Sequence, residues 1–207
     1  MVCCFSLFSK KGVCQKKYAL FGIETEIPYK KDNKLRFFVN PEIIENGAAW
    51  LFPCGERARF GVGSYDGNTK ILPNLKKFVE SYGLKVGKIH GGYLCYCLKN
   101  PIVENIFVVG CAAGQTLPLT GEGIKRSIKF GLLCGDIIQE ILDKKITIKE
   151  GQEEYKKEAL KNKGEYELLL DEQKKLPKMP NWELGLMTRL LNIKPINKYI
   201  LKRYEKI

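Results

Sequence analysis

A glycine-rich run, Gly110–Ile124, constrains this chain more than any other segment. The apolar residues 105–109 before it predict a buried strand, and residues 124–142 after it repeat apolar side chains at helical spacing. The repeating apolar side chains are Ile124, Ile128, Leu132, Ile137, Ile138, Ile141 and Leu142. A glycine-rich turn before a helix presents free N–H groups and a positive dipole end, which suits a phosphate or another anion. The alternative is an ordinary strand–turn–helix whose glycines only permit tight packing.

The part of the chain before this run predicts an antiparallel sheet. Four segments carry the β-forming residues and partial alternation typical of strands: 18–27, 34–40, 48–53 and 58–63. We expect two consecutive hairpins, with turns at residues 28–33 and 54–57. Residues 69–82 then predict a helix with Pro73 near its start, and residues 85–96 predict a further strand broken by Gly91-Gly92.

The glycine-rich run resembles the second flavin motif of the geranylgeranyl reductase family, which belongs to the two-domain FAD-dependent oxidoreductases. That motif reads Gly-Asp-Ala-Ala-Gly, a short spacer, and Pro-Leu-Thr-Gly-Glu-Gly-Ile. Pro118–Ile124 matches it throughout, whereas Cys111 stands where the family has Asp. The resemblance implies that FAD contacts Gly110, Cys111, Ala112, Gly114, Pro118, Thr120, Gly121, Glu122, Gly123 and Ile124. A thiol is a weak hydrogen-bond partner for the ribityl hydroxyls, so Cys111 predicts a partial FAD site.

A second segment resembles the Tyr-x-Trp-x-Phe-Pro motif of the same family. Trp50, Phe52 and Pro53 match this motif, and Ala48 replaces its Tyr. The resemblance implies that the matching residues bind the isoprenoid chain of a prenyl lipid substrate beside the flavin. Strand alternation places Trp50 and Phe52 on one face, and large aromatic side chains suit an apolar ligand. The alternative is that both rings only pack the sheet against its neighbours.

The resemblance covers roughly residues 17–142 and implies an α+β fold. We expect an antiparallel sheet substrate domain, the C-terminal strand–turn–helix part of a two-domain FAD oxidoreductase, and a helical tail. The expected divisions are a remnant N-terminal segment at 1–16, a substrate-binding sheet at 17–104, a flavin-contacting unit at 105–143, and a Lys-rich helical tail at 144–207. Pro177, Pro180 and Pro195 should divide that tail into short helices.

The chain lacks the GxGxxG turn with which the family binds the FAD pyrophosphate. The expected function is therefore the C-terminal half of a reductase of isoprenoid C=C bonds, with a separately encoded FAD-binding subunit. The alternative is a non-catalytic truncated homologue or a lipid-binding module without flavin. No side chain is assigned as catalytic: His90, the single histidine, is either a proton donor near the cavity or, as we expect, a solvated strand-end residue.

The formal net charge of +12 comes mostly from lysine and predicts a solvated basic surface, with peripheral attraction to an anionic membrane as the alternative. Nucleic acid is not an expected partner, because no basic stripe alternates with stacking aromatic residues. Without a signal-peptide pattern, the eight cysteines predict reduced thiols in a cytoplasmic protein. One histidine and a CxC spacing give no support for a metal site.

Overall fold

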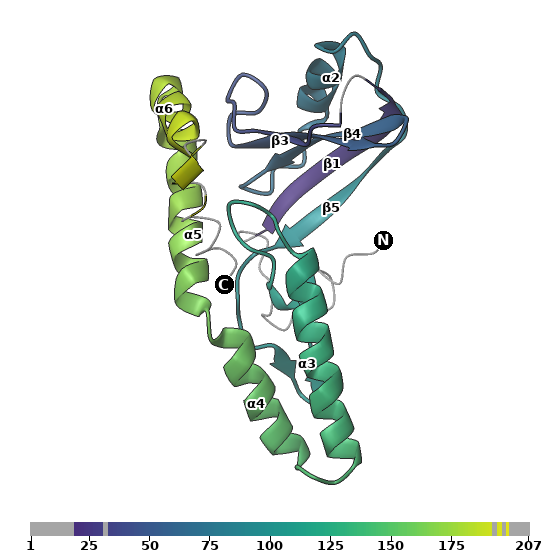
Figure 1. Ribbon diagram of the computed structural model, residues 1–207, viewed down its shortest axis with the longest axis vertical. Helices are drawn as coiled ribbons and strands as arrows, with labels where there is room; N and C mark the ends of the chain where they lie inside the picture. The colour runs from purple at the N-terminus through teal and green to yellow at the C-terminus, as the bar shows by residue number, and fades with distance from the viewer. Residues whose placement is uncertain (1–18, 31–32, 192–193, 196–197, 199–207) are drawn as a thin grey trace.

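The computed structural model describes residues 19–30, 33–191, 194–195 and 198 (Figure 1). The predicted remnant segment, 1–16, lies outside the described residues. Five antiparallel strands form a sheet in the order β2-β3-β4-β1-β5. The strands are Ala19–Pro28 (β1), Arg36–Phe38 (β2), Gly47–Cys54 (β3), Arg57–Ser64 (β4) and Ile89–Cys95 (β5). The predicted sheet is therefore confirmed, with β5 added at its edge.

One face of this sheet holds the main hydrophobic core. Alternate residues of β1, β3 and β4 point to that face, and helix α2 (Leu72–Glu80) packs across it. The buried side chains include Ile23, Ile27, Leu51, Phe60, Val62, Leu75, Phe78 and Val79. The opposite face of the same strands is turned toward the glycine-rich run, and this is where the predicted site lies.

The pairing of the strands corrects part of the sequence-based prediction. The first predicted hairpin, with a turn at 28–33, is wrong, because β2 pairs with β3 and not with β1. Both edges of β1 are occupied, by β4 and β5, so no free edge remains for β2. The second hairpin is confirmed, with β3 and β4 joined through Gly55 at φ +64°. Strand β5 is continuous through Gly91-Gly92, where Gly91 leaves room for the backbone of β1.

The C-terminal part is helical. Its elements are α3 (Ile124–Leu142), α4 (Ile148–Leu160), α5 (Lys163–Lys175), the 3-10 turn η3 (Leu176–Lys178) and α6 (Asn181–Leu191). Helices α3 and α4 extend away from the sheet as a hairpin, and α5 and α6 run back toward it (Figure 1). Leu176 and Leu184 then pack against Ala48 and Tyr65 at the sheet. None of the described helices is long and apolar enough to cross a membrane.

The predicted strand at 105–109 is shorter than expected. Only Ile106–Phe107 (β7) forms a strand, and it pairs with Ile102–Val103 (β6). Among the described residues no third strand lies beside this pair, so its ladder ends after two residues. Val109 is extended and leads directly into the 3-10 turn η2 (Gly110–Ala113).

The bounds of α3 are as predicted, and its apolar residues are divided between a buried and an exposed side. The structure buries Arg126, Phe130, Cys134 and Ile137. It leaves five of the repeating apolar residues exposed, namely Ile124, Ile128, Leu132, Ile138 and Leu142. The reason is that α4 and the β6–β7 hairpin pack against one side of α3, while no described element covers the other side.

Candidate functional site

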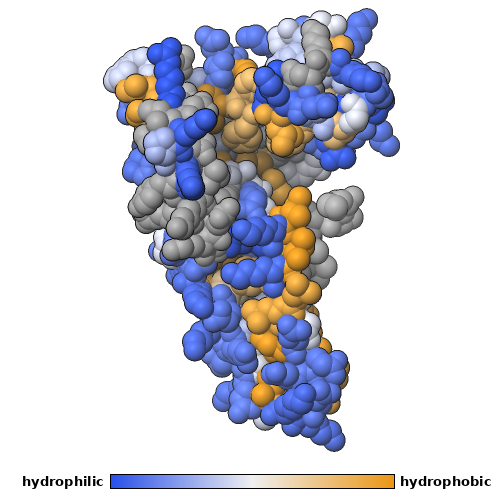
Figure 2. All heavy atoms as spheres, in the orientation of Figure 1, coloured by the Kyte–Doolittle hydropathy of each residue, from blue (hydrophilic) through white to orange (hydrophobic). Residues whose placement is uncertain are grey.

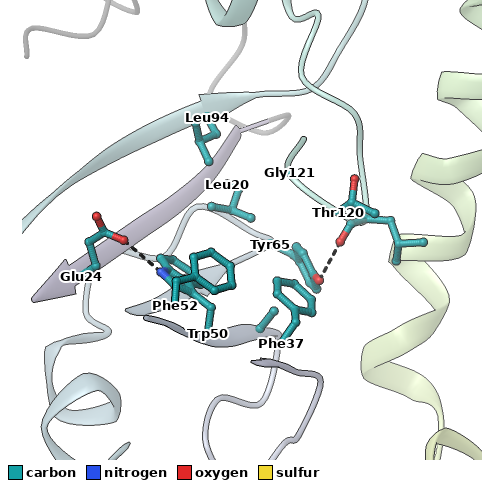
Figure 3. A pocket seen from close by; sticks show the side chains of 12 residues that line it. Leu20, Glu24, Phe37, Trp50, Phe52, Tyr65, Leu94, Thr120 and Gly121 are labelled. Atoms are coloured by element: carbon teal, nitrogen blue, oxygen red, sulfur yellow. Dashed lines mark hydrogen bonds between the residues drawn. The ribbon is translucent and has the colours of Figure 1, made fainter. Parts of the chain in front are cut away.

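An apolar cavity of about 220 Å³ lies between the second face of the sheet and the glycine-rich turn (Figure 3). Trp50 and Phe52 of β3 line it on the sheet side, and Thr120 and Gly121 line it on the side of the turn. Two motifs that are far apart in the sequence therefore meet at one cavity. Pro53, the third residue of the predicted substrate motif, is not among the residues that line it.

Three glycines of the sheet, Gly22, Gly61 and Gly63, lie beneath the Trp50 ring. A Cβ atom added at Gly22 or Gly63 would lie 3.3 Å from carbons of the indole, and one added at Gly61 would overlap the ring. The indole can therefore lie flat over β4 and β1 because these positions carry no side chain. Sequence reasoning placed Gly61 and Gly63 in a hairpin and missed Gly22. The available signal was a large aromatic residue opposite alternate glycines in neighbouring strands.

Glu24 forms a polar wall of the cavity. Its Oε2 accepts a hydrogen bond of 3.0 Å from Trp50 Nε1 (Figure 3). Its Oε1 lies 2.9 Å from His90 Nε2. Arg59 Nη1 is 3.9 Å from the same Oε1. The Glu24 side chain is 19% exposed, whereas that of His90 is 54% exposed. His90 is thus the expected solvated residue, and it is connected to the cavity through Glu24. Sequence reasoning missed Glu24, although alternation along 23–27 places it on the non-core face.

Buried polar side chains fix the backbone of the glycine-rich turn. Gln115 Oε1 accepts the Gly110 N–H at 2.5 Å, and Tyr166 Oη donates to the Gln115 carbonyl at 2.6 Å. Gln173 Oε1 accepts the Leu119 N–H at 2.6 Å. Helix α5 therefore contributes two anchors, Tyr166 and Gln173, to a turn that lies far from it in the sequence. These side chains rigidify the loop before any ligand binds.

Gly114 in the turn must be a glycine, because the backbone of another segment lies very close to it. Gly114 has φ +68°, and a Cβ atom there would overlap the backbone of Cys97. On the other side, Tyr65 Oη donates a hydrogen bond of 3.2 Å to the Leu119 carbonyl and ties the sheet to the turn (Figure 3). Burial raises the pKa of Tyr65 well above its usual range, so this hydroxyl stays protonated and able to donate.

Unpaired polar groups collect where the turn enters α3. Gly123 is the N-cap of this helix and provides no side-chain cap, and Gly121 at φ +68° faces open space. Glu122 Oε1 and the Nε and Nη2 atoms of Arg126 are buried without a hydrogen-bond partner among the described residues. Arg126 is only 2% exposed. The positive end of the α3 dipole and the Arg126 guanidinium therefore share this place with the Glu122 carboxylate, so charges of both signs meet at the start of the helix.

The remaining predicted flavin contacts differ in their surroundings. Pro118 is buried, Ala112 is half-buried, and Ile124 is 80% exposed. Cys111 is tied to β5, since its Sγ lies 3.1 Å from the backbone nitrogen of Cys95, which donates to it. The expectation of reduced thiols is wrong for Cys95, which is disulfide-bonded.

Comparison with known proteins finds curated relatives over most of this chain. Digeranylgeranylglycerophospholipid reductase from Methanocaldococcus jannaschii is 30% identical over 88% of this chain and 49% of its own length. A second such reductase, from Methanopyrus kandleri, is 25% identical over 89% of this chain and 49% of its own. No protein-family model matches the chain. The chain thus spans about half the length of these curated relatives.

The fold of this chain is similar to that of a solved structure. A geranylgeranyl bacteriochlorophyll reductase-like protein from Thermoplasma acidophilum superposes with a TM-score of 0.77 and 21% sequence identity. The superposition covers 92% of this chain and 53% of the other chain. The expected α+β fold, with its antiparallel sheet and helical tail, is therefore confirmed.

Proposed function

Because the chain belongs to the geranylgeranyl reductase family of FAD-dependent oxidoreductases and corresponds to its C-terminal portion, we propose that it is the substrate-binding and flavin-capping half of a reductase of isoprenoid C=C bonds. The observation that carries this proposal is the cavity that joins the strand of Trp50 and Phe52 to the turn of Thr120 and Gly121. A substrate held against the sheet there lies beside the segment assigned to the cofactor.

The sheet side of the cavity suits a prenyl chain. The Trp50 and Phe52 rings are stacked, with centroids 6.3 Å apart and planes inclined by 30°. Leu20 and Leu94 add further apolar surface. A cavity of about 220 Å³ is smaller than the roughly 300–1,000 Å³ typical of drug-sized ligand pockets. We therefore assign it to one segment of a prenyl lipid, with the rest of the lipid outside the cavity.

The turn provides part of a site for FAD. The backbone of Thr120–Ile124 and the uncapped start of α3 would hold the edge of the flavin on which negative charge collects during reduction. Gly121 allows the ring to approach closely because no Cβ occupies the open space there. The chemistry that reduced FAD would supply there is a hydride equivalent for one carbon of the C=C bond, with a proton needed at the other carbon. Cys111 offers no carboxylate to the ribityl hydroxyls, and we assign the pyrophosphate site to a separate FAD-binding subunit.

A second candidate is a lipid-binding module without flavin. It is favoured by Cys111 and Ala48, which both depart from the family motifs, and by a cavity built wholly from this chain. In either case we propose that the lysine-rich surface makes peripheral contact with an anionic membrane that delivers the lipid.

One experiment tests both candidates. The chain is co-expressed with the half of the Methanocaldococcus jannaschii reductase that it does not match, and FAD absorbance is measured in the purified product. Prenyl lipid binding is followed by Trp50 fluorescence in a Trp182→Phe background, since the chain has two tryptophans and Trp182 is exposed. Retained FAD together with lipid binding supports the reductase half. Lipid binding without FAD supports the second candidate, and failure of both contradicts both.

A further inference from the structure

Helix α6 exposes a second apolar side in addition to the one that packs on the sheet. Trp182, Leu186 and Leu190 follow one another at intervals of four residues, so they lie along one face of the helix. They are 71%, 50% and 45% exposed, whereas Leu184, on the opposite side, is buried. A row of large apolar side chains in solvent is a candidate interaction site. We call Trp182, Leu186 and Leu190 the α6 face.

The charges around the α6 face are mostly positive. Lys178 precedes the helix, Arg189 lies in its last turn, and Lys194 and Lys198 follow it; all four are exposed. Over residues 176–207 the sequence carries seven basic and two acidic residues. Exposed Trp and Leu with Lys and Arg beside them are typical of a helix that lies in the surface of an anionic membrane.

Helix α3 also exposes apolar side chains, but it lacks this charge pattern. Figure 2 shows the apolar side chains of α3 gathered in a band. The exposed charged residues of α3 are Lys125, Lys129, Asp136 and Glu140, two of each sign. An anionic surface should therefore attract α6 and leave α3 without net attraction, which makes α3 a matched comparison for a test.

The buried side of α6 packs beside the apolar cavity. Leu184 belongs to the same apolar cluster as Leu20, Ala48 and Tyr65, and these three residues line the cavity. Figure 1 shows α6 at the end of the molecule where the sheet lies, away from the far end of the α3–α4 hairpin. A membrane bound at the α6 face would be separated from this cluster by the width of one helix, roughly 10 Å.

We infer that α6 is the helix by which this chain docks on an anionic lipid bilayer: the α6 face enters the bilayer interface, and Lys178 and Arg189 contact lipid phosphates. A second copy of the same helix is disfavoured as the occupant, because it would bring two positively charged segments together. This inference rests on the proposed function, in which a membrane delivers a prenyl lipid. It adds the surface that makes the contact and sets the cavity beside the bilayer.

The test uses the full chain and vesicles made of equal parts of phosphatidylglycerol and phosphatidylcholine, with vesicles of phosphatidylcholine alone for comparison. Binding is measured by flotation. In a Trp50→Phe background Trp182 is the only tryptophan, so its emission reports on the α6 face. The chain should bind the anionic vesicles, Trp182 emission should shift to shorter wavelength, and added salt should weaken the binding.

Leu186→Asp should lower the partition coefficient by about tenfold or more, because it places a carboxylate in the apolar face. Ile128→Asp on α3 and Leu168→Asp on α5 are the matched controls, since these residues are likewise exposed, at 60% and 56%, and each variant adds the same single charge. Both controls should bind nearly as the parent chain does.

The basic residues are tested by a pair of double variants. Lys178→Gln combined with Arg189→Gln should lower binding by about fivefold for each charge, or about 25-fold together. Lys149→Gln combined with Lys157→Gln on α4 removes the same net charge from two exposed positions and should have a much smaller effect.

The other outcomes separate the surface from the function. Equal binding by Leu186→Asp and its controls, equal binding to both kinds of vesicle, or no vesicle binding by the parent chain would each overturn the inference. The proposed function would then still stand on prenyl lipid binding in detergent, followed by Trp50 fluorescence. Vesicle binding that depends on α6, without prenyl lipid binding, would support the docking helix and contradict the proposed function. Thermal unfolding of each variant shows that it is folded, as expected for exposed positions.

Discussion

Gly61 supports the cavity by leaving space for the Trp50 ring, and its replacement by alanine tests that role. The added methyl group would overlap the indole, which must then move away from β4. Overpacking of this kind typically costs about 1–3 kcal/mol. Moving the indole also breaks its hydrogen bond to Glu24, while alanine regains roughly 0.5–1 kcal/mol of strand propensity over glycine. We expect a net loss of about 2 kcal/mol, or roughly 4–8 °C in Tm for a chain of this size.

The assay is a double-mutant cycle measured by denaturant unfolding. In a Trp50→Ala background the ring is absent, so Gly61→Ala should then be neutral or slightly stabilising. Gly92→Ala in β5 is the matched control, because a Cβ atom there meets nothing within 4 Å. Gly61→Ala should also weaken prenyl lipid binding, since the displaced ring occupies the cavity. An equal loss of stability from Gly61→Ala with and without Trp50 would refute the reasoning.

Three further predictions concern the turn and its supports. Cys111→Asp should strengthen FAD binding by the co-expressed complex, measured as FAD retained on dilution, and unchanged retention would contradict the assignment of Cys111 to the ribityl contact. Arg126→Met should stabilise the isolated chain by about 1–3 kcal/mol in denaturant unfolding, because it removes a buried guanidinium with unpaired N–H groups; a destabilised variant would contradict this. Tyr155 donates to the Val108 carbonyl at 2.9 Å, and burial raises its pKa to about 12. Its contribution to stability is present below pH 10 and is lost as the pH rises toward 12, so Tyr155→Phe should show a weaker loss of stability over that range than the parent chain.

Much of the architecture could be predicted from local sequence patterns. The second hairpin follows from two β-forming runs joined through Cys54–Arg57, and α3 follows from its helical repeat between Gly123 and Asp143. The strand order could not be predicted, because pairing depends on which edges remain free. The short strand β2 reaches the edge of the sheet through β3, although β1 precedes it in the sequence.

The cavity joins two segments that the family resemblance singled out, whereas the residues that support them were missed. Trp50 and Thr120 were named from that resemblance, whereas Gly22 and Glu24 contribute through their position across the sheet from Trp50. Likewise Gln173 holds the turn from α5, and nothing in its local sequence indicates this contact. Such residues contribute through tertiary contacts. Alternation along a strand can suggest the face on which a residue lies, but it does not say which residue it contacts.

The helical repeat of α3 predicted the helix but not which of its sides is buried. Periodicity reports that apolar residues recur on a helix, but it does not say which element covers them. Helix α3 is apolar on two sides: Phe130 and Ile137 face α4 and the β6–β7 hairpin, while Ile128 and Leu132 face solvent. A helix that is apolar on most of its circumference is typical of an internal helix. The same sequence pattern is therefore consistent with an α3 that lies between two layers, one of which is in this chain.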